Sequence, residues 1–166
     1  GSFQPDGNLS DFDQQSMTGT WQLWIYNSQS GSSYDITVTS WKLIITYDSS
    51  TPSDPDAATT YTNSSSFSTS GAGVTTSDLA ISDAGTITDI NVELNATNTY
   101  STSALSDTDF KLISPYGTIV DLAVSNSFNS TYSLSATVLD DEASTSIGGG
   151  SAPYFGSFNP DGNLSD

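Results

Sequence analysis

The sequence predicts an all-β protein with a jelly-roll-like β-sandwich fold. Apolar and polar residues alternate with a period of two in many short segments, and turns rich in Gly, Ser and Asn separate these segments. No segment carries the apolar stripe of an amphipathic helix. Such a succession of short strands is typical of β-sandwiches and jelly rolls. With 166 residues, the chain is long enough for one such domain and too short for two.

The expected strands can be taken in order along the chain. They cover residues 19–27, 36–47, 85–97, 109–115, 117–124 and 132–140. In the first strand, Trp21 and Ile25 share one face, whereas Trp24 and Tyr26 lie on the other. In the third strand the alternation slips once, which predicts a β-bulge near Asp89.

One segment of the sequence occurs twice. Residues 1–11 (GSFQPDGNLSD) recur as residues 156–166 (GSFNPDGNLSD), and only Gln4 and Asn159 differ between the copies. The period is too long for a solenoid repeat and matches a whole domain. We therefore expect one repeat of a longer array, with the duplication of a single loop as the alternative.

Residues 48–72 are expected to form a linker. They contain Pro52, Pro55 and a long Ser/Thr run, and they show no sustained alternation. This linker would separate a first part, residues 1–47, from a second part, residues 73–166.

The charge of the chain excludes several classes of partner. Nineteen acidic residues face two basic ones, Lys42 and Lys111, and the formal net charge is −17. Nucleic acids and anionic membrane surfaces would be repelled, because binding to either requires a cluster of Lys or Arg side chains. A charge this high also opposes folding by self-repulsion. We expect divalent cations to neutralise part of it, and carboxylate and carbonyl oxygens suit Ca²⁺.

The absence of two residue types excludes most catalysis. Without Cys there is no disulfide or thiolate chemistry, and without His there is no Ser-His-Asp triad and no imidazole base. No apolar run approaches the length of a membrane span, so membrane insertion is not expected. The absence of His and Cys predicts a protein that is not an enzyme. Because uncharged Ser, Thr and Asn crowd nearly every segment, we expect it to be secreted or to lie on an extracellular surface.

Several motifs together resemble a known family. They are SDAGTITDINVELNAT (residues 82–97), SDTDFKLISPYGTIVDL (106–122), VLDDEA (138–143), GSFNPDGNLSD (156–166), LSDFD (9–13), GTWQLWI (19–25) and WKLII (41–45). This set resembles the P domain, or Homo B domain, of proprotein convertases and bacterial subtilisin-like proteases. The resemblance implies a β-sandwich with Trp21 and Trp41 in its core. Asn27 and Leu139 depart from the pattern, since the family has Asp and Phe at these places.

The motifs occur in a rotated order, because the family's last pieces stand at the start of this chain. Three arrangements explain the rotation. In the first, the chain is one part of a tandem array. In the second, subunits exchange strands, so that residues 1–47 complete the fold of a neighbouring subunit. In the third, the chain closes on itself through residues 48–72. The duplicated segment favours the first two.

Clusters of carboxylates are the candidate metal ligands. Asp140, Asp141 and Glu142 stand together at a strand end, and their like charges would repel without a cation. Asp107 and Asp109 precede another strand. The resemblance implies that Ca²⁺ binds in these loops. Asp83 and Asp89 are weaker candidates, because an Asp at a strand start more often caps a turn.

Other residues are candidates for contacts with partners. Trp24 and Tyr26 could stack on sugar rings, lie at an interface between copies, or be covered by another part of the fold. Five Asn residues head glycosylation sequons, namely Asn8, Asn63, Asn95, Asn129 and Asn163. We expect a structural repeat unit of an extracellular array, adhesin or filament, rigidified by Ca²⁺, whose partners are neighbouring copies. A carbohydrate-binding or protease-accessory module is the alternative.

Overall fold

The structure is a computed structural model, and it describes residues 8–48, 58–98, 100–101, 104–128 and 133–161. These residues contain ten strands and no α-helix. The strands are β1 (Gly19–Asn27), β2 (Thr37–Asp48), β3 (Thr59–Asn63), β4 (Phe67–Ser68), β5 (Gly73–Ile81), β6 (Thr86–Thr97), β7 (Thr108–Ile113), β8 (Ile119–Ala123), β9 (Ser133–Leu139) and β10 (Gly156–Phe158). Four short 3₁₀ helices are η1 (Leu9–Phe12), η2 (Ser32–Tyr34), η3 (Leu105–Asp107) and η4 (Ile147–Gly149).

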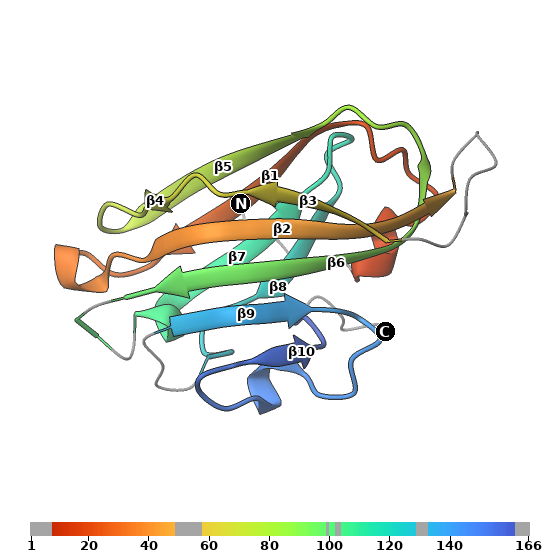
Figure 1. The fold of residues 1–166 in the computed structure, drawn as a ribbon. Coiled ribbons are helices and arrows are strands. Elements are labelled where there is room, and N and C mark those ends of the chain that lie inside the picture. Colours follow the sequence, from red (N-terminus) through yellow and green to blue (C-terminus); the bar gives the residue numbers. More distant parts are fainter. Residues whose placement is uncertain (1–7, 49–57, 99, 102–103, 129–132, 162–166) are drawn as a thin grey trace.

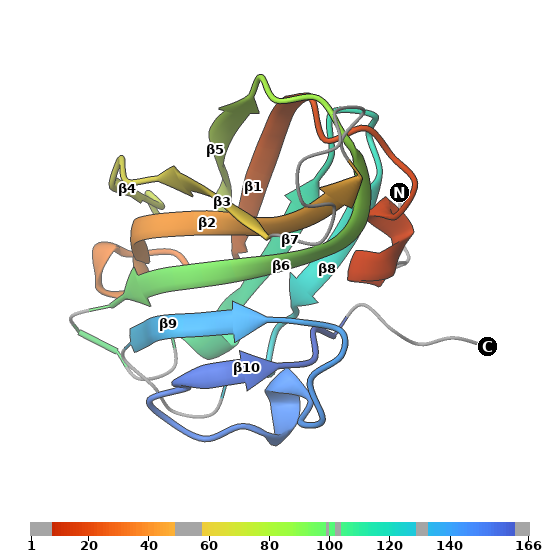
Figure 2. The same ribbon diagram turned by 45° about the vertical axis from the view of Figure 1, so that its right-hand side comes forward.

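Two sheets pack face to face (Figures 1 and 2). The smaller sheet has the order β5-β1-β7-β8, and the larger has the order β10-β9-β6-β2-β3, with β4 also pairing with β2. The pairs are antiparallel except for β10 and β9, which run parallel. The predicted all-β sandwich is therefore confirmed, and the jelly-roll topology stays a prediction.

The core lies between the sheets and follows the sequence alternation. Trp21 and Ile25 of β1 and Trp41 of β2 are fully buried. Each buried indole has a hydrogen-bond acceptor: Nε1 of Trp21 donates to the carbonyl of Met17, and Nε1 of Trp41 donates to Oγ of Ser77. Burial of a large apolar side chain contributes about 1.5–3 kcal/mol, so these positions anchor the fold.

The expected bulge in β6 is confirmed. The pairing with β2 shifts register at this point, with Thr46 opposite Asp89 and Tyr47 opposite Ile87. Thr88 is the extra residue, so Ile87 and Ile90 can both face the core although they are three positions apart. Asp89 consequently lies outside the core, where it can meet other polar groups.

The expected linker differs from the structure in part. Within residues 48–72, β3 and β4 pair with β2 at the edge of the larger sheet. The alternation of β3 is hard to recognise, because its residues are only half-buried or exposed and most are Thr. Its Tyr61 donates a hydrogen bond to Asp83. Pro52 and Pro55 lie outside the described residues.

The sandwich is completed within one chain. β1 lies between β5 and β7, and β2 pairs with β6 along most of its length. The described residues of 1–47 thus supply strands to both sheets of their own chain. The tandem array and the strand exchange stay predictions.

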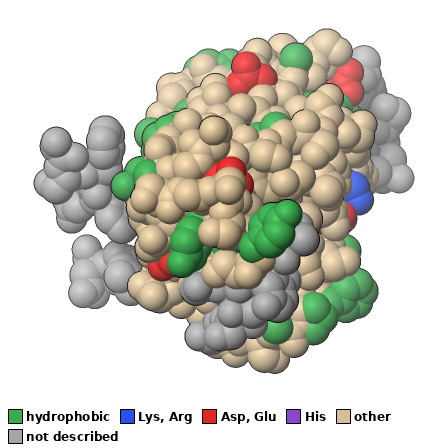
Figure 3. Space-filling model, turned by 90° about the vertical axis from the view of Figure 1, so that its left-hand side faces the viewer, with side chains coloured by type: hydrophobic (Ala, Val, Ile, Leu, Met, Phe, Trp, Pro, Cys, Tyr) green, Lys and Arg blue, Asp and Glu red, His purple; other side chains and the backbone are tan. Residues whose placement is uncertain are grey.

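The surface reflects the polar composition. Figure 3 shows one end of the sandwich, where most atoms belong to uncharged polar residues or backbone, with scattered acidic and hydrophobic side chains. In the described part of the chain, no helix has the length and apolar character needed to cross a membrane.

One of the two lysines forms an ion pair across the larger sheet. Lys42 of β2 lies opposite Glu93 of β6, with Nζ 2.8 Å from Oε1. Although burial opposes the shift, hydrogen bonds from Lys42 and Asn95 hold the pKa of Glu93 below its usual value. The pair is partly exposed, so its contribution is small.

Glu93→Gln is expected to lower the free energy of unfolding by less than about 1 kcal/mol at pH 7. Because the pKa of Glu93 is lower in the folded state, its stabilisation is present above the unfolded value and is lost as pH falls through the folded one. Urea unfolding at pH 7 and pH 3 tests this. An equal loss at both pH values would show that the effect comes from packing and not from charge.

Candidate functional site

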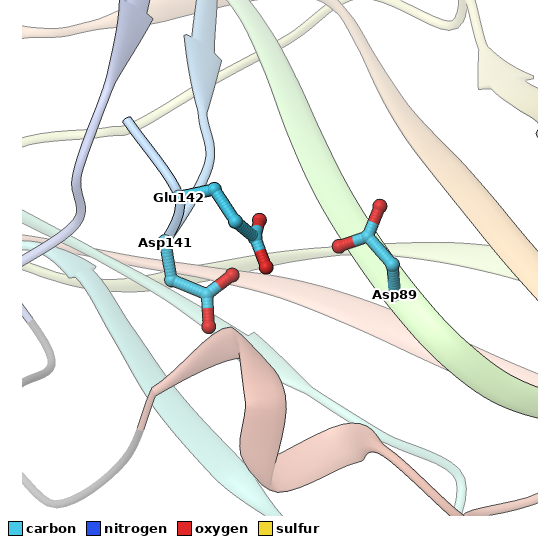
Figure 4. Close-up of side chains that lie close together, drawn as sticks. All are labelled: Asp89, Asp141 and Glu142. Carbon is cyan, nitrogen blue, oxygen red and sulfur yellow. The ribbon is translucent and has the colours of Figure 1, made fainter. Parts of the chain in front are cut away.

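Three carboxylates form a cluster at one end of the sandwich. Asp89 comes from β6, and Asp141 and Glu142 come from the turn after β9 (Figure 4). Each contributes a ligand oxygen, and these oxygens all lie within 4.8 Å of one another. Asp89 and Asp141 are half-buried, whereas Glu142 is exposed.

Local hydrogen bonds explain why the cluster forms. β9 pairs with β6 up to Leu139, opposite Val92, so the turn that follows lies beside Asp89. Oδ1 of Asp140 accepts a hydrogen bond from the backbone N–H of Glu142 at 2.9 Å, which closes the turn in the manner of an Asx-turn. The turn thereby directs Asp141 and Glu142 towards β6.

The segment around η1 contacts the same cluster. The backbone N–H of Ser10 donates to Oδ2 of Asp141 at 3.0 Å. Asp13, at the end of η1, has its pKa raised by burial and by the charges of Asp141 and Asp89. Three segments that are distant in sequence therefore place negative charge in one region.

The cluster changes the protonation of its members. Burial, a hydrogen bond with Asp140 and the charges of Asp141 and Asp89 together raise the pKa of Glu142 to about 7. Burial, with the charges of Asp141 and Asp140, also raises the pKa of Asp89. Near neutral pH Glu142 is therefore only partly ionised, and a bound cation would favour its ionised form.

Two further oxygens at this end of the molecule lack hydrogen-bond donors. Oδ1 of Asp13 and Oδ1 of Asn91 are buried and accept no hydrogen bond. The amide of Asn91 donates to Oδ2 of Asp89 at 3.2 Å, so its own oxygen is left over. A buried acceptor without a donor costs about 1–3 kcal/mol. Such oxygens, together with carboxylates, are the ligands that Ca²⁺ prefers.

The structure sorts the predicted metal ligands into two groups. Asp141 and Glu142 join the cluster, and Asp140 shapes the turn that carries them. Asp109 lies elsewhere and accepts hydrogen bonds from the backbone and the hydroxyl of Ser125. Asp107 belongs to η3, and Asp83 accepts a hydrogen bond from Tyr61; among the described residues neither joins a group that could hold a metal.

Sequence reasoning missed part of the cluster. The sequence marks Asp89 only as a weak candidate, because an Asp at a strand start more often caps a turn, and it gives no signal for Asp13 or Asn91. The slip in the alternation of residues 85–97 was a usable signal, because a bulge turns a polar residue away from the core and often lies beside a functional site.

The second candidate feature is an aromatic pair on the outer face of the smaller sheet. The rings of Trp24 and Tyr26 stack with their centroids 6.1 Å apart and their planes 22° apart. Lys111 lies over Trp24, with Nζ 5.5 Å from the ring centroid, and forms an ion pair with Asp121 at 2.6 Å. Tyr26 is 37% exposed, so one end of this aromatic platform is accessible.

The sequons differ in their surroundings. The side-chain amide of Asn95 donates to Ser40 and Glu93 and accepts from the N–H of Ala136, so a glycan there would have to break these bonds. Asn63 donates to the carbonyl of Asp78. Asn8 precedes η1 and is half-buried. Asn129 and Asn163 lie outside the described residues.

The fold and the site together define an all-β sandwich with an acidic cluster at one end. No family model matches the chain, and neither a curated protein nor a solved structure matches it. The resemblance to the P domain therefore stays a prediction that depends on the motifs alone.

Proposed function

We propose that the chain is a structural repeat unit of a secreted extracellular array, adhesin or filament, and that Ca²⁺ rigidifies it. The observation that carries this proposal is the duplicated segment, which occurs at both ends of one complete sandwich. A unit of this kind can be joined to the next copy with the same sequence at every junction.

The acidic cluster supports the role of Ca²⁺. Asp89, Asp141 and Glu142 supply carboxylate oxygens, and Asp13 and Asn91 carry further buried oxygens that accept no hydrogen bond. A cation at this place would connect β6 with the turn after β9, whose Asp141 also accepts a hydrogen bond from Ser10 of η1. These elements belong to different parts of the sequence, so the cation would resist their separation.

Particle length measured by negative-stain electron microscopy tests the proposal. In excess Ca²⁺ the chain is expected to form long particles, and EDTA is expected to shorten them. Asp141→Asn should weaken the dependence on Ca²⁺, whereas Asp48→Asn, which removes an exposed charge at the end of β2, should leave it unchanged. A compact monomer of the same size under all conditions would contradict the array.

A carbohydrate-binding module is the second candidate, and the stacked pair of Trp24 and Tyr26 favours it. Aromatic rings bind the apolar faces of sugars, and the ammonium group of Lys111 beside them could donate hydrogen bonds to sugar hydroxyls. Binding to a glycan array that is lost in Trp24→Ala would support this role. The absence of binding at high protein concentration would remove it.

A further inference from the structure

Both copies of the repeated segment contribute described residues, namely 156–161 of the second copy and 8–11 of the first. The remaining residues of both copies lie outside the described part of the chain.

Residues 156–161 lie at the edge of the larger sheet, where β10 runs beside β9 (Figure 2). We call the groups of β9, Thr145 and Ile147 that hold them the slot. β10 pairs in parallel with Thr137–Leu139 of β9, and Phe158 is only 9% exposed. The N–H of Asn159 donates to the carbonyl of Thr145 at 2.7 Å, and its carbonyl accepts from the N–H of Ile147 at 2.8 Å. This slot therefore recognises both the backbone and the buried side chains of its occupant.

The end of the segment reaches the smaller sheet. The N–H of Asp161 donates to the carbonyl of Leu122 in β8 at 3.3 Å. Its carboxylate accepts hydrogen bonds from the N–H of Val124, at 2.9 Å, and from the hydroxyl of Ser127. Six residues thus connect β9 of one sheet with β8 of the other.

The other half of the repeat docks next to this slot. Leu9 of the repeat is fully buried, and the next residue after the repeat, Phe12, packs edge-on against Trp21 with the ring centroids 5.1 Å apart. Asp141 contacts both halves: its carboxylate accepts from the N–H of Ser10, and its carbonyl accepts from Nδ2 of Asn159 at 2.7 Å. Described residues of the two copies therefore lie next to each other, on either side of Asp141.

We propose that the slot is a self-recognition site, which takes residues 1–6 of a second copy in place of the chain's own residues 156–161. This inference rests on the array function proposed above and names the contact between its units. The occupant GSFNPD and the candidate GSFQPD share the buried Phe and the Asp that reaches β8. Gln4 replaces Asn159 and keeps an amide donor on a side chain one methylene longer.

The energetics of the exchange follow from this near identity. Each chain carries two segments of nearly identical sequence, residues 1–6 and 156–161, and the slot takes one segment at a time. Replacing one segment by the other changes almost no contacts, which is why segment exchange between copies costs little. The chain's own segment is favoured by its high effective concentration, so exchange is expected to increase with protein concentration.

A disulfide experiment tests the exchange, since the chain has no Cys of its own. Ser157 lies in register with Val138, and the pair is on the less buried side of β10 and β9. In the full-length variant Ser157→Cys/Val138→Cys, mild oxidation should close a disulfide within one chain, which verifies the geometry of the slot.

The test variant is Ser2→Cys/Val138→Cys, because Ser2 is the counterpart of Ser157. We expect disulfide-linked dimers and longer ladders on a non-reducing gel, several-fold more abundant at high protein concentration. Ser2→Cys/Ser135→Cys places the second thiol on the same strand outside the register of β10 and measures random collisions. In the test variant, adding Phe3→Ala should remove the ladder, and adding Phe158→Ala should strengthen it.

Other outcomes would overturn the proposal. A disulfide formed only within single chains would show that residues 1–6 bind their own slot, and no more cross-linking than in the Ser135 control would show that they do not bind a slot at all. If Ca²⁺-dependent long particles persist without the ladder, the exchange fails and the array stands. If both are absent, both proposals fail.

Discussion

Saturating Ca²⁺ at pH 8 is expected to raise the midpoint of thermal unfolding by about 5–10 °C. A ligand at a hundred times its dissociation constant stabilises the folded state by about 2.7 kcal/mol, and a domain of this size shifts by about 2–4 °C per kcal/mol. The stabilisation would come from a cation placed among Asp89, Asp141 and Glu142, whose oxygens already lie within 4.8 Å of one another. Differential scanning calorimetry with Ca²⁺ and with EDTA measures it.

The metal-free chain should also show a pH dependence of defined sign. Burial and the neighbouring carboxylates raise the pKa of Glu142 to about 7 from its ordinary value of 4.5. The folded state therefore holds more protons than the unfolded state between these values, and this group makes the protein less stable as pH rises through the window. In EDTA the midpoint should be higher at pH 5 than at pH 8, and Ca²⁺ should reduce the difference.

Glu142→Gln separates the two effects. Without Ca²⁺ at pH 8 this variant should be at least as stable as the natural chain, because a repelling charge is gone. With Ca²⁺ it should be less stable, because a ligand is gone. Asp48→Asn, which changes the net charge equally at an exposed position, should show no such reversal. A Ca²⁺ effect of the same size in Glu142→Gln and in the natural chain would mean that the cation binds elsewhere.

Lys111→Met is expected to lower the free energy of unfolding by about 3 kcal/mol. The carboxylate of Asp121 is 1% exposed, and its described charged partner is Lys111, with Nζ 2.6 Å from Oδ1. Neither oxygen of Asp121 accepts a well-formed hydrogen bond, so the ion pair is its main compensation. Breaking a buried pair costs about 3–5 kcal/mol, and the lower end applies because Lys111 is 18% exposed.

The other lysine provides the matched control. Lys42→Met breaks a pair whose side chains are 31% and 14% exposed, and it should cost less than about 1 kcal/mol. Met at position 111 keeps an unbranched chain against Trp24, so lost packing contributes little. The double variant Lys111→Met/Asp121→Leu should recover most of the stability in urea unfolding, since no unpaired charge remains. If Lys111→Met and Lys42→Met lower the free energy of unfolding by the same amount, burial of Asp121 does not make its ion pair more important for stability.

Six of the ten strands in the described part of this protein follow closely from its sequence, namely β1, β2, β6, β7, β8 and β9. Side-chain direction alternates along a strand, so the pattern of β1 predicted that Trp21 and Ile25 share one face and that Trp24 and Tyr26 share the other. The resemblance to the P domain implied that Trp21 lies in the core, and the structure buries it. The slip near Asp89 likewise located the bulge in β6. The strands β3, β4, β5 and β10 were not predicted. They lie at sheet edges, where a strand with only one neighbour needs few apolar residues.

By itself, therefore, the sequence determined the all-β class, which residues of β1 share a face, the bulge and the duplicated segment. Only the tertiary structure decided which segments meet. It brought Asp89 to Asp141 and Glu142 through the pairing of β6 with β9, and Lys111 to Asp121 through the pairing of β7 with β8. The physical reason is that periodicity is a local property that specifies on which face a side chain lies. The order and register of strands depend on contacts between distant segments, which no local pattern records.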